Sequence, residues 1–123
     1  MSSTLHFQEI FDRLRMILHK YEEKLVVVTD TPSYYYLDSP KINPLNKKPN
    51  FFGAVKLNKN YVSFYLMPVY ACPSLVESFS EDLKKHKKGK SCFNIKKFDN
   101  SLFDELEKLT ENGFEFFKLK ELV

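Results

Sequence analysis

The sequence predicts an α+β fold: a two-layer sandwich with a mainly antiparallel sheet of about five strands and N- and C-terminal helices on one face. Two observations support this prediction. Apolar residues recur at helical spacing near both ends of the chain, and alternating apolar runs joined by short turns fill its middle. With 123 residues, of which 43% are hydrophobic and 28% charged, the chain has the size and composition of one folded domain, residues 1–123.

The first part of the chain combines one helix with two short strands. Apolar residues at helical spacing predict an amphipathic helix over Thr4–Glu23 that covers one face of the sheet. β-Branched residues predict a strand at Leu25–Thr29, and the turn residues Asp30–Ser33 separate it from a second strand at Tyr34–Leu37. The prolines and asparagines of Asp38–Asn50 predict one long irregular loop.

The centre of the chain reads as a β-hairpin, because two alternating runs, Phe51–Leu57 and Val62–Leu66, flank a short Asn/Lys turn. Alternation places every second side chain on the core face. With Gly53 as a gap, the predicted core residues of the hairpin are Phe51, Val55, Leu57, Val62, Phe64 and Leu66. The predicted opposite face, which no helix covers, carries Lys56, Tyr61, Ser63 and Tyr65.

A helical connection is expected after the hairpin. Ser74 and Glu77 have the spacing of a capping box, and Ser80 marks a second helix start. Lysines fill the end of this second helix, and Gly89 follows where a C-cap glycine would stand.

A further strand and a last helix complete the predicted fold. Cys92–Lys96 predicts a strand with Phe93 and Ile95 facing inward. The last helix is expected to begin near Asp99, and Gly113 follows its apolar stripe as a stop. The residues beyond form a short closing segment that packs on the core: Phe114, Phe116, Phe117, Leu119 and Leu122.

The densest positive charge lies at Lys84–Ser91. Lysines and free backbone donors there, with Lys90 and Ser91 at the strand entry, could hold a phosphate or a carboxylate. The segment is not a P-loop, because Lys84 occupies the position that the first glycine of that motif needs. In the alternative interpretation, these cations only complement the negative end of a helix dipole.

Tyrosines form a second candidate surface on the open face of the sheet. The set comprises Tyr34, Tyr36, Tyr61 and Tyr65, with Lys56 beside them. Such rings could stack on the bases of a single-stranded nucleic acid, form a homodimer interface, or be ordinary half-buried sheet tyrosines. No RNA-binding aromatic motif is present, and a net charge of +3 is mild, so nucleic acid is not the expected partner.

Metal and catalytic patterns are weak. Cys72, His86 and Cys92 lack the close spacing of zinc ligands, and His6 and His19 are too far apart on one helix to share a metal. No triad, nucleophile elbow or dinucleotide motif occurs, so we expect neither catalysis nor a cofactor. Carboxylates in the first and last helices could hold a hard cation such as iron, or could form solvated helix faces.

The expected location is the cytoplasm, without a membrane partner. The first residues lack a basic region followed by an apolar one, and no apolar run is long enough to cross a bilayer. Two cysteines are too few for a disulfide scaffold, so both thiols are expected to be free.

Three blocks resemble the YdhG-like family of small bacterial cytosolic domains. They are the hairpin, with Gly53-Ala54-Val55 and Val62–Pro68, the segment Gly89–Ile95, and the start of the last helix, Leu102–Leu106. The resemblance covers the chain from about Asn50 onward and implies an α+β domain, most members having no known function. Some relatives are regarded as frataxin-like iron chaperones. That role needs an acidic surface, and the net charge of +3 departs from this acidic character.

The functional hypothesis from the sequence is therefore a non-catalytic binding or accessory domain for an anionic small ligand or a protein partner. Its binding surface would be either the tyrosine face or the Lys84–Ser91 segment, and the protein partner could be a second copy of the chain in a homodimer. The alternative, which rests on the family resemblance, is an intracellular iron chaperone.

Overall fold

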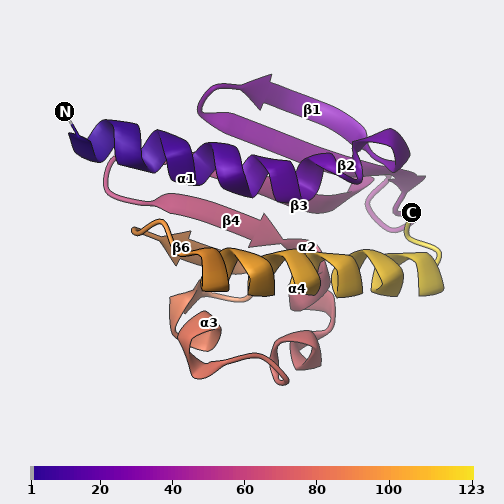
Figure 1. Cartoon of the computed structure of the whole chain (residues 1–123). Helices are drawn as coiled ribbons and strands as arrows, with labels where there is room; N and C mark the ends of the chain where they lie inside the picture. The colour runs from indigo at the N-terminus through magenta and orange to yellow at the C-terminus, as the bar shows by residue number, and fades with distance from the viewer. Residues whose placement is uncertain (1) are drawn as a thin grey trace.

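The computed structural model describes residues 2–123, with side chains from residue 6 onward. Six antiparallel strands form one sheet in the order β1-β2-β3-β4-β6-β5 (Figure 1). The strands are β1 (Val26–Thr31), β2 (Tyr34–Ile42), β3 (Pro49–Leu57), β4 (Val62–Leu66), β5 (Lys87–Lys88) and β6 (Cys92–Ile95). The helices are α1 (Ser2–His19), α2 (Met67–Ala71), α3 (Glu81–His86) and α4 (Asn100–Leu119), with 3-10 turns η1 (Glu22–Lys24) and η2 (Pro73–Val76). The predicted fold class is confirmed, and the additional strand is the two-residue edge strand β5.

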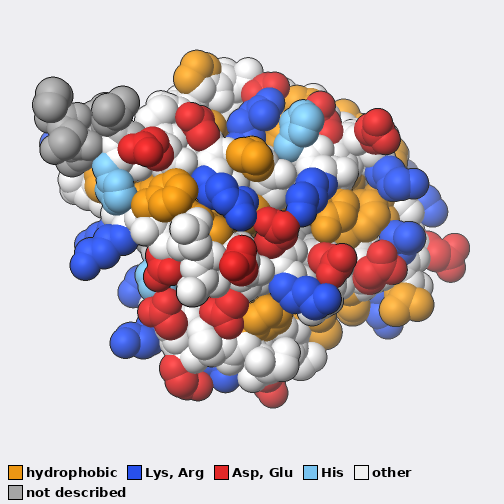
Figure 2. Space-filling model, viewed as in Figure 1, with side chains coloured by type: hydrophobic (Ala, Val, Ile, Leu, Met, Phe, Trp, Pro, Cys, Tyr) orange, Lys and Arg blue, Asp and Glu red, His pale blue; other side chains and the backbone are white. Residues whose placement is uncertain are grey.

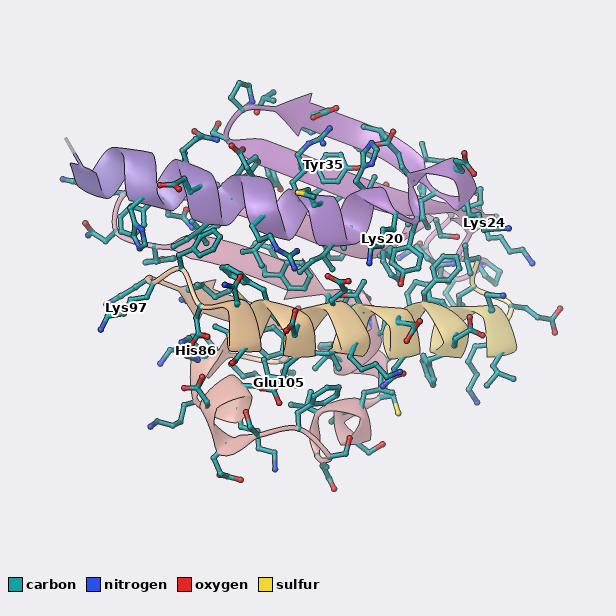
Figure 3. The ribbon with its side chains drawn as sticks, viewed as in Figure 1. Lys20, Lys24, Tyr35, His86, Lys97 and Glu105 are labelled. Carbon is teal, nitrogen blue, oxygen red and sulfur yellow. The ribbon has the colours of Figure 1, made fainter. Side chains whose placement is uncertain are left out.

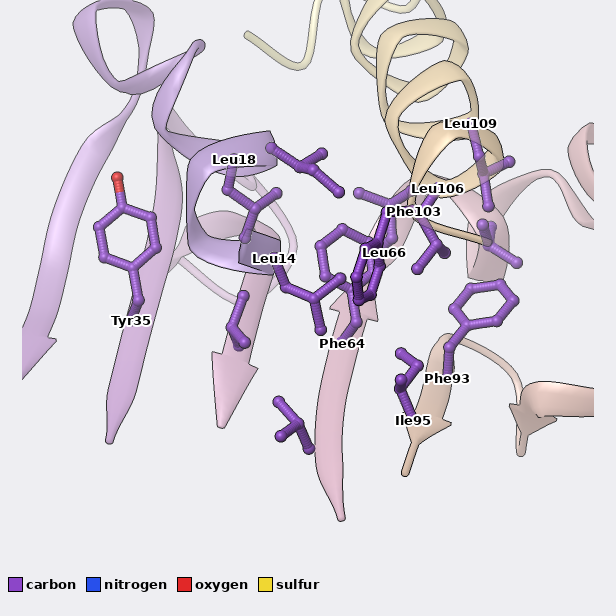
Figure 4. Close-up of a cluster of buried hydrophobic side chains, with 14 of the residues drawn as sticks. Leu14, Leu18, Tyr35, Phe64, Leu66, Phe93, Ile95, Phe103, Leu106 and Leu109 are labelled. Carbon is purple, nitrogen blue, oxygen red and sulfur yellow. The ribbon is translucent and has the colours of Figure 1, made fainter. Parts of the chain in front are cut away.

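The two long helices, α1 and α4, lie side by side across the same face of the sheet (Figure 1). Their apolar stripes meet the inward row of the strands in a continuous core (Figure 4). Fully buried residues of this core include Leu14, Leu18, Tyr35, Phe64, Leu66, Phe93, Ile95, Phe103, Leu106 and Leu109. The connection that contains α2, η2 and α3 packs beside α4, and no described helix is long and apolar enough to cross a membrane.

A bulge in β3 changes the predicted assignment of two phenylalanines. Leu37 of β2 pairs with Gly53, but the next residue, Asp38, pairs with Phe51, so Phe52 is an extra residue in β3. Phe52 is fully buried, whereas Phe51 is half-buried on the other side of the sheet, 4.7 Å from the ring of Tyr36. The prediction that Phe51 belongs to the core row was therefore wrong, because strict alternation does not hold across a bulge.

Gly113 lies inside α4 and does not end it, contrary to the predicted stop. A Cβ atom at this position would lie 2.9 Å from Cβ of Pro68, so the absent side chain lets α4 approach α2. The segment that was expected to be separate belongs to the same helix. Phe114 and Phe117 are buried in the core, while Leu119 is exposed at the helix end.

The predicted irregular loop Asp38–Asn50 is much shorter in the structure. β2 extends to Ile42 and β3 starts at Pro49, and these two residues are paired in the ladder. The remaining turn is ordered by asparagine side chains, since Asn43 Oδ1 accepts a hydrogen bond from the backbone N–H of Leu45 at 2.9 Å. The ladder is irregular between Asp38 and Ile42, where Pro40 lies, and pairing resumes at Ile42 and Pro49.

Two predicted helix signals in the connection have other roles. The Ser74–Glu77 pair does not form a capping box, because the short 3-10 turn there has no side-chain cap. Ser80 does cap α3, as predicted, by accepting a hydrogen bond from the backbone N–H of Leu83. Gly89 is not a helix C-cap: α3 ends at His86, and the positive φ of Gly89, 72°, belongs to the turn between β5 and β6.

Candidate functional site

A groove of about 620 Å³ lies at the β5–β6 end of the molecule, between α3 and the start of α4. Figure 3 shows His86 and Lys97 projecting at this end. Most of its polar lining is cationic or aromatic: Lys85, His86, Lys88, Lys96, Lys97 and Tyr61. We refer to this feature as the lysine groove. Because it is concave and brings charged and aromatic side chains together, it is the first candidate for a ligand site.

One wall of the lysine groove is held in place by α3. Leu83 of this helix is fully buried, which directs Lys85 and His86 toward the surface. Ser80 ties the helix start to α4, because its hydroxyl and its backbone N–H both donate to the carboxylate of Glu105, at 2.6 and 3.0 Å. The wall therefore has a fixed position relative to the core.

The opposite wall consists of the residues between β6 and α4. His6 of α1 donates from Nε2 to the backbone carbonyl of Lys96 at 3.2 Å, which fastens this segment to the core. Asp99 caps α4 by accepting a hydrogen bond from the backbone N–H of Leu102 at 3.2 Å. Buried Leu102 adds an apolar part to the groove.

The electrostatics of the lysine groove favour an anion. Its four lysines are exposed, and none of them forms an ion pair with a described side chain, residues 6–123. Two aspartates also line it, and one of these, Asp99, is engaged as a helix cap. His86 donates from Nδ1 to the carbonyl of Asp82 at 2.7 Å, so its Nε2 is the nitrogen available to a ligand. Unpaired positive charge therefore lines the groove.

Asn94 reaches the lysine groove from the sheet, and a hydrogen-bond chain fixes its side chain. Asn58 Nδ2 donates to Ser63 Oγ at 2.9 Å, and Ser63 Oγ donates to Asn94 Oδ1 at 2.9 Å. The Cys92 thiol donates to the same oxygen at 3.3 Å. Because Oδ1 accepts both hydrogen bonds, the N–H donors are the groups that Asn94, which lines the groove, has left for a ligand.

The predicted Lys84–Ser91 segment is divided in the structure. Lys85, His86 and Lys88 line the lysine groove, but Lys90 and Ser91 do not. The ammonium of Lys90 lies 5.6 Å from the ring centre of Tyr70, and the carbonyl of Ser91 accepts the backbone N–H of Leu66 in the sheet. The sequence interpretation missed Lys96, Lys97 and Asn94; the available signal was the lysine pair at the end of the predicted strand Cys92–Lys96.

The predicted tyrosine face also divides. Strand register places Tyr34, Tyr36 and Tyr65 on the uncovered side of the sheet, where the ring centres of Tyr34 and Tyr36 are 5.9 Å apart. The ammonium of Lys56 lies 5.5 Å from the ring centre of Tyr34, so Lys56 is beside the tyrosines as predicted. Tyr61, in contrast, belongs to the lysine groove.

Partial burial raises the pKa values of several groups on the uncovered side of the sheet. Desolvation raises the pKa of Asp38, Tyr36 and Tyr65 above their ordinary values. It also raises the pKa of the Cys92 thiol, so this cysteine is not an activated nucleophile. Both cysteines are free thiols, as expected.

The carboxylates of α1 and α4 are interleaved with cations (Figure 2). Glu107 of α4 contacts Arg13 of α1 at 3.2 Å and also Lys20, whose hydrogen bond lowers the pKa of Glu107. On the same helix, Glu111 pairs with Lys108. Within the described side chains, no group of three or more His, Cys, Asp or Glu residues is arranged to hold a metal ion.

Comparison of this chain with protein-family models, with curated proteins and with solved structures gave no match. The resemblance to the YdhG-like family therefore stays a prediction from the sequence.

Proposed function

We propose that this chain is a non-catalytic binding domain whose lysine groove takes a small anionic ligand. The observation that supports this most directly is a groove of about 620 Å³ lined by four lysines that have no carboxylate partner among the described side chains. This volume is within the range of small-molecule sites. We propose cytoplasmic action, which agrees with the two free thiols.

The sequence left open whether these lysines only neutralise the end of α3. Lys96 and Lys97 come from the opposite wall, beyond β6, so they do not serve the dipole of that helix. Cations that converge on one groove from two separate segments favour an anion between them. Lysine ammonium groups act as mobile point charges, which suits a phosphate group.

Calorimetric titration with pyrophosphate tests the proposal. We expect saturable binding that weakens by about tenfold or more when Lys85→Glu and Lys97→Glu are combined, one from each wall. Lys41→Glu is the matched control, because Lys41 is exposed on β2 at the far part of the sheet and should leave the affinity unchanged. Absence of saturable binding, or equal losses in the control, would overturn the proposal.

For the protein partner, we propose a second copy of this chain on the uncovered sheet face. Asp38 and Lys56 lie at opposite ends of the aromatic stripe formed by Tyr34, Tyr36 and Phe51, and within the described residues neither charge has an ion-pair partner. A two-fold axis across the strands would place Asp38 of one copy opposite Lys56 of the other. This arrangement would neutralise both charges while it covers the rings.

Sedimentation velocity over a range of protein concentrations tests the second copy. Lys56→Glu should weaken self-association, and adding Asp38→Lys should restore it, because the charges are then exchanged. Lys59→Glu, on the neighbouring turn, is the control and should have no effect. A monomer at every concentration contradicts this contact.

Iron delivery remains the alternative that the family resemblance implies. It would require carboxylates of α1 and α4 to be free for the ion. Glu107 instead contacts Arg13 and Lys20, and the structure offers no observation that favours iron.

A further inference from the structure

We propose that the ligand of the lysine groove is a nucleoside phosphate: the lysines hold the phosphates, Tyr61 stacks on the base, and the Asn94 amide donates a hydrogen bond to the ligand. This inference rests on the proposed anion-binding function and specifies its ligand class. It depends on three features of the groove, namely an aromatic ring without a partner, an oriented amide, and their place beside the cations.

Tyr61 differs from the other tyrosines of the described chain. Tyr21, Tyr34, Tyr35, Tyr36 and Tyr70 each have an aromatic or cationic partner at their ring. The hydroxyl of Tyr65 has the polar neighbours Ser63 and Cys92.

Tyr61 has neither kind of contact among the described residues. It is half-buried in the wall of the lysine groove. A ring face that is left free next to ammonium groups is suited to stacking on a nucleobase.

Strand register places this ring close to the cations. Val62 pairs with Ile95 and Ser63 with Asn94 in the antiparallel ladder, so Tyr61 comes opposite Lys96 at its end. The phosphate-binding candidates Lys85 and Lys88 come from α3 and β5 on the other wall. A ligand that has a flat ring at one end and phosphates at the other can therefore contact both kinds of group.

Asn94 supplies the directional contact. Ser63 is only 2% exposed, and its hydroxyl holds Asn94 Oδ1 while Asn58 holds Ser63 in turn. The amide N–H groups are thereby the groups that Asn94 has left for a ligand, and their partner must be an acceptor such as a base carbonyl, a ring nitrogen or a phosphate oxygen. Ser63 and Asn58 are positioning residues in this chain of contacts.

Calorimetric titration of the intact chain with ADP, GDP, CDP and UDP, each compared with pyrophosphate, tests the inference. We expect at least one nucleoside diphosphate to bind about tenfold or more tightly than pyrophosphate. Tyr61→Leu should lower nucleotide affinity by about tenfold or more and pyrophosphate affinity far less, so that most of this difference disappears, and Tyr61→Phe should preserve it. Tyr70→Leu, which alters an exposed tyrosine outside the groove, is the matched control.

A second variant tests the amide. Asn94→Asp replaces the donors by an anion and should weaken nucleotide binding by about tenfold or more, whereas Asn58→Ala, which only loosens the positioning, should have a smaller effect.

The outcomes separate the ligand class from the proposed function. If pyrophosphate binds as tightly as every nucleotide, or if Tyr61→Leu weakens both equally, the nucleoside inference is overturned while anion binding stands. If neither pyrophosphate nor any nucleotide binds, the proposed function fails as well.

Discussion

The bulge in β3 predicts a large difference between two adjacent phenylalanines. Phe52 is fully buried and its ring centre lies 6.3, 5.8 and 5.4 Å from those of Tyr21, Phe114 and Phe117. Phe52→Ala should therefore lower the free energy of unfolding by roughly 3–5 kcal/mol, the usual cost of truncating a buried phenylalanine. Phe51 is half-buried and has one ring neighbour among the described side chains, Tyr36, so Phe51→Ala should cost about 1 kcal/mol.

Urea unfolding, followed by circular dichroism, measures both differences. The midpoint should fall far more for Phe52→Ala than for Phe51→Ala, with similar slopes. Phe52→Leu, which retains part of the buried volume, gives an intermediate reading if the alanine variant does not fold. Equal losses of unfolding free energy in the two variants, or a larger loss for Phe51→Ala, would contradict the bulge.

Two further predictions concern α4. Gly113→Ala should destabilise the fold by about 1 kcal/mol in urea unfolding, because overpacking against Pro68 outweighs the better helix propensity of alanine; a stabilised variant would contradict the close approach. Glu107→Gln should lower stability by less than about 1 kcal/mol at neutral pH, since the ion pairs are partly exposed. The pKa of Glu107 is lowered from 4.5, chiefly by Lys20, so the carboxylate stabilises the fold above that pH. This contribution is lost as pH falls through the lowered value, and the gap between the two proteins should close there; a gap that widens in acid would refute the pairing.

Periodicity in the sequence predicted the layers correctly but not every local boundary. The helical spacing of α1 and the alternation of β6 reflect burial on one face, which apolar patterning records directly. Phe51 and Gly113 were misassigned because a bulge and a close helix approach depend on residues distant in sequence. Gly113, which was predicted to end the helix, instead allows the close contact with Pro68.

The candidate site was only partly predictable for a similar reason. The lysines of α3 and β5 form a visible run, so Lys85 and Lys88 fell within the predicted segment. The role of Lys96 and Lys97 depends on how β6 leads into α4, and that of Asn94 on pairing between β4 and β6. A local sequence pattern does not show which distant segments line the same groove. For this reason the sequence interpretation grouped Tyr61 with the tyrosines of the sheet.

Backbone amide shifts during a pyrophosphate titration test anion binding in the lysine groove most directly. We predict that the largest saturable changes in the nitrogen–proton NMR spectrum occur at Lys85–Lys88 and Lys96–Asp99, the two walls that carry the lysines. Changes of similar size throughout the surface, or confined to segments outside these two walls, would contradict a built anion site in this groove.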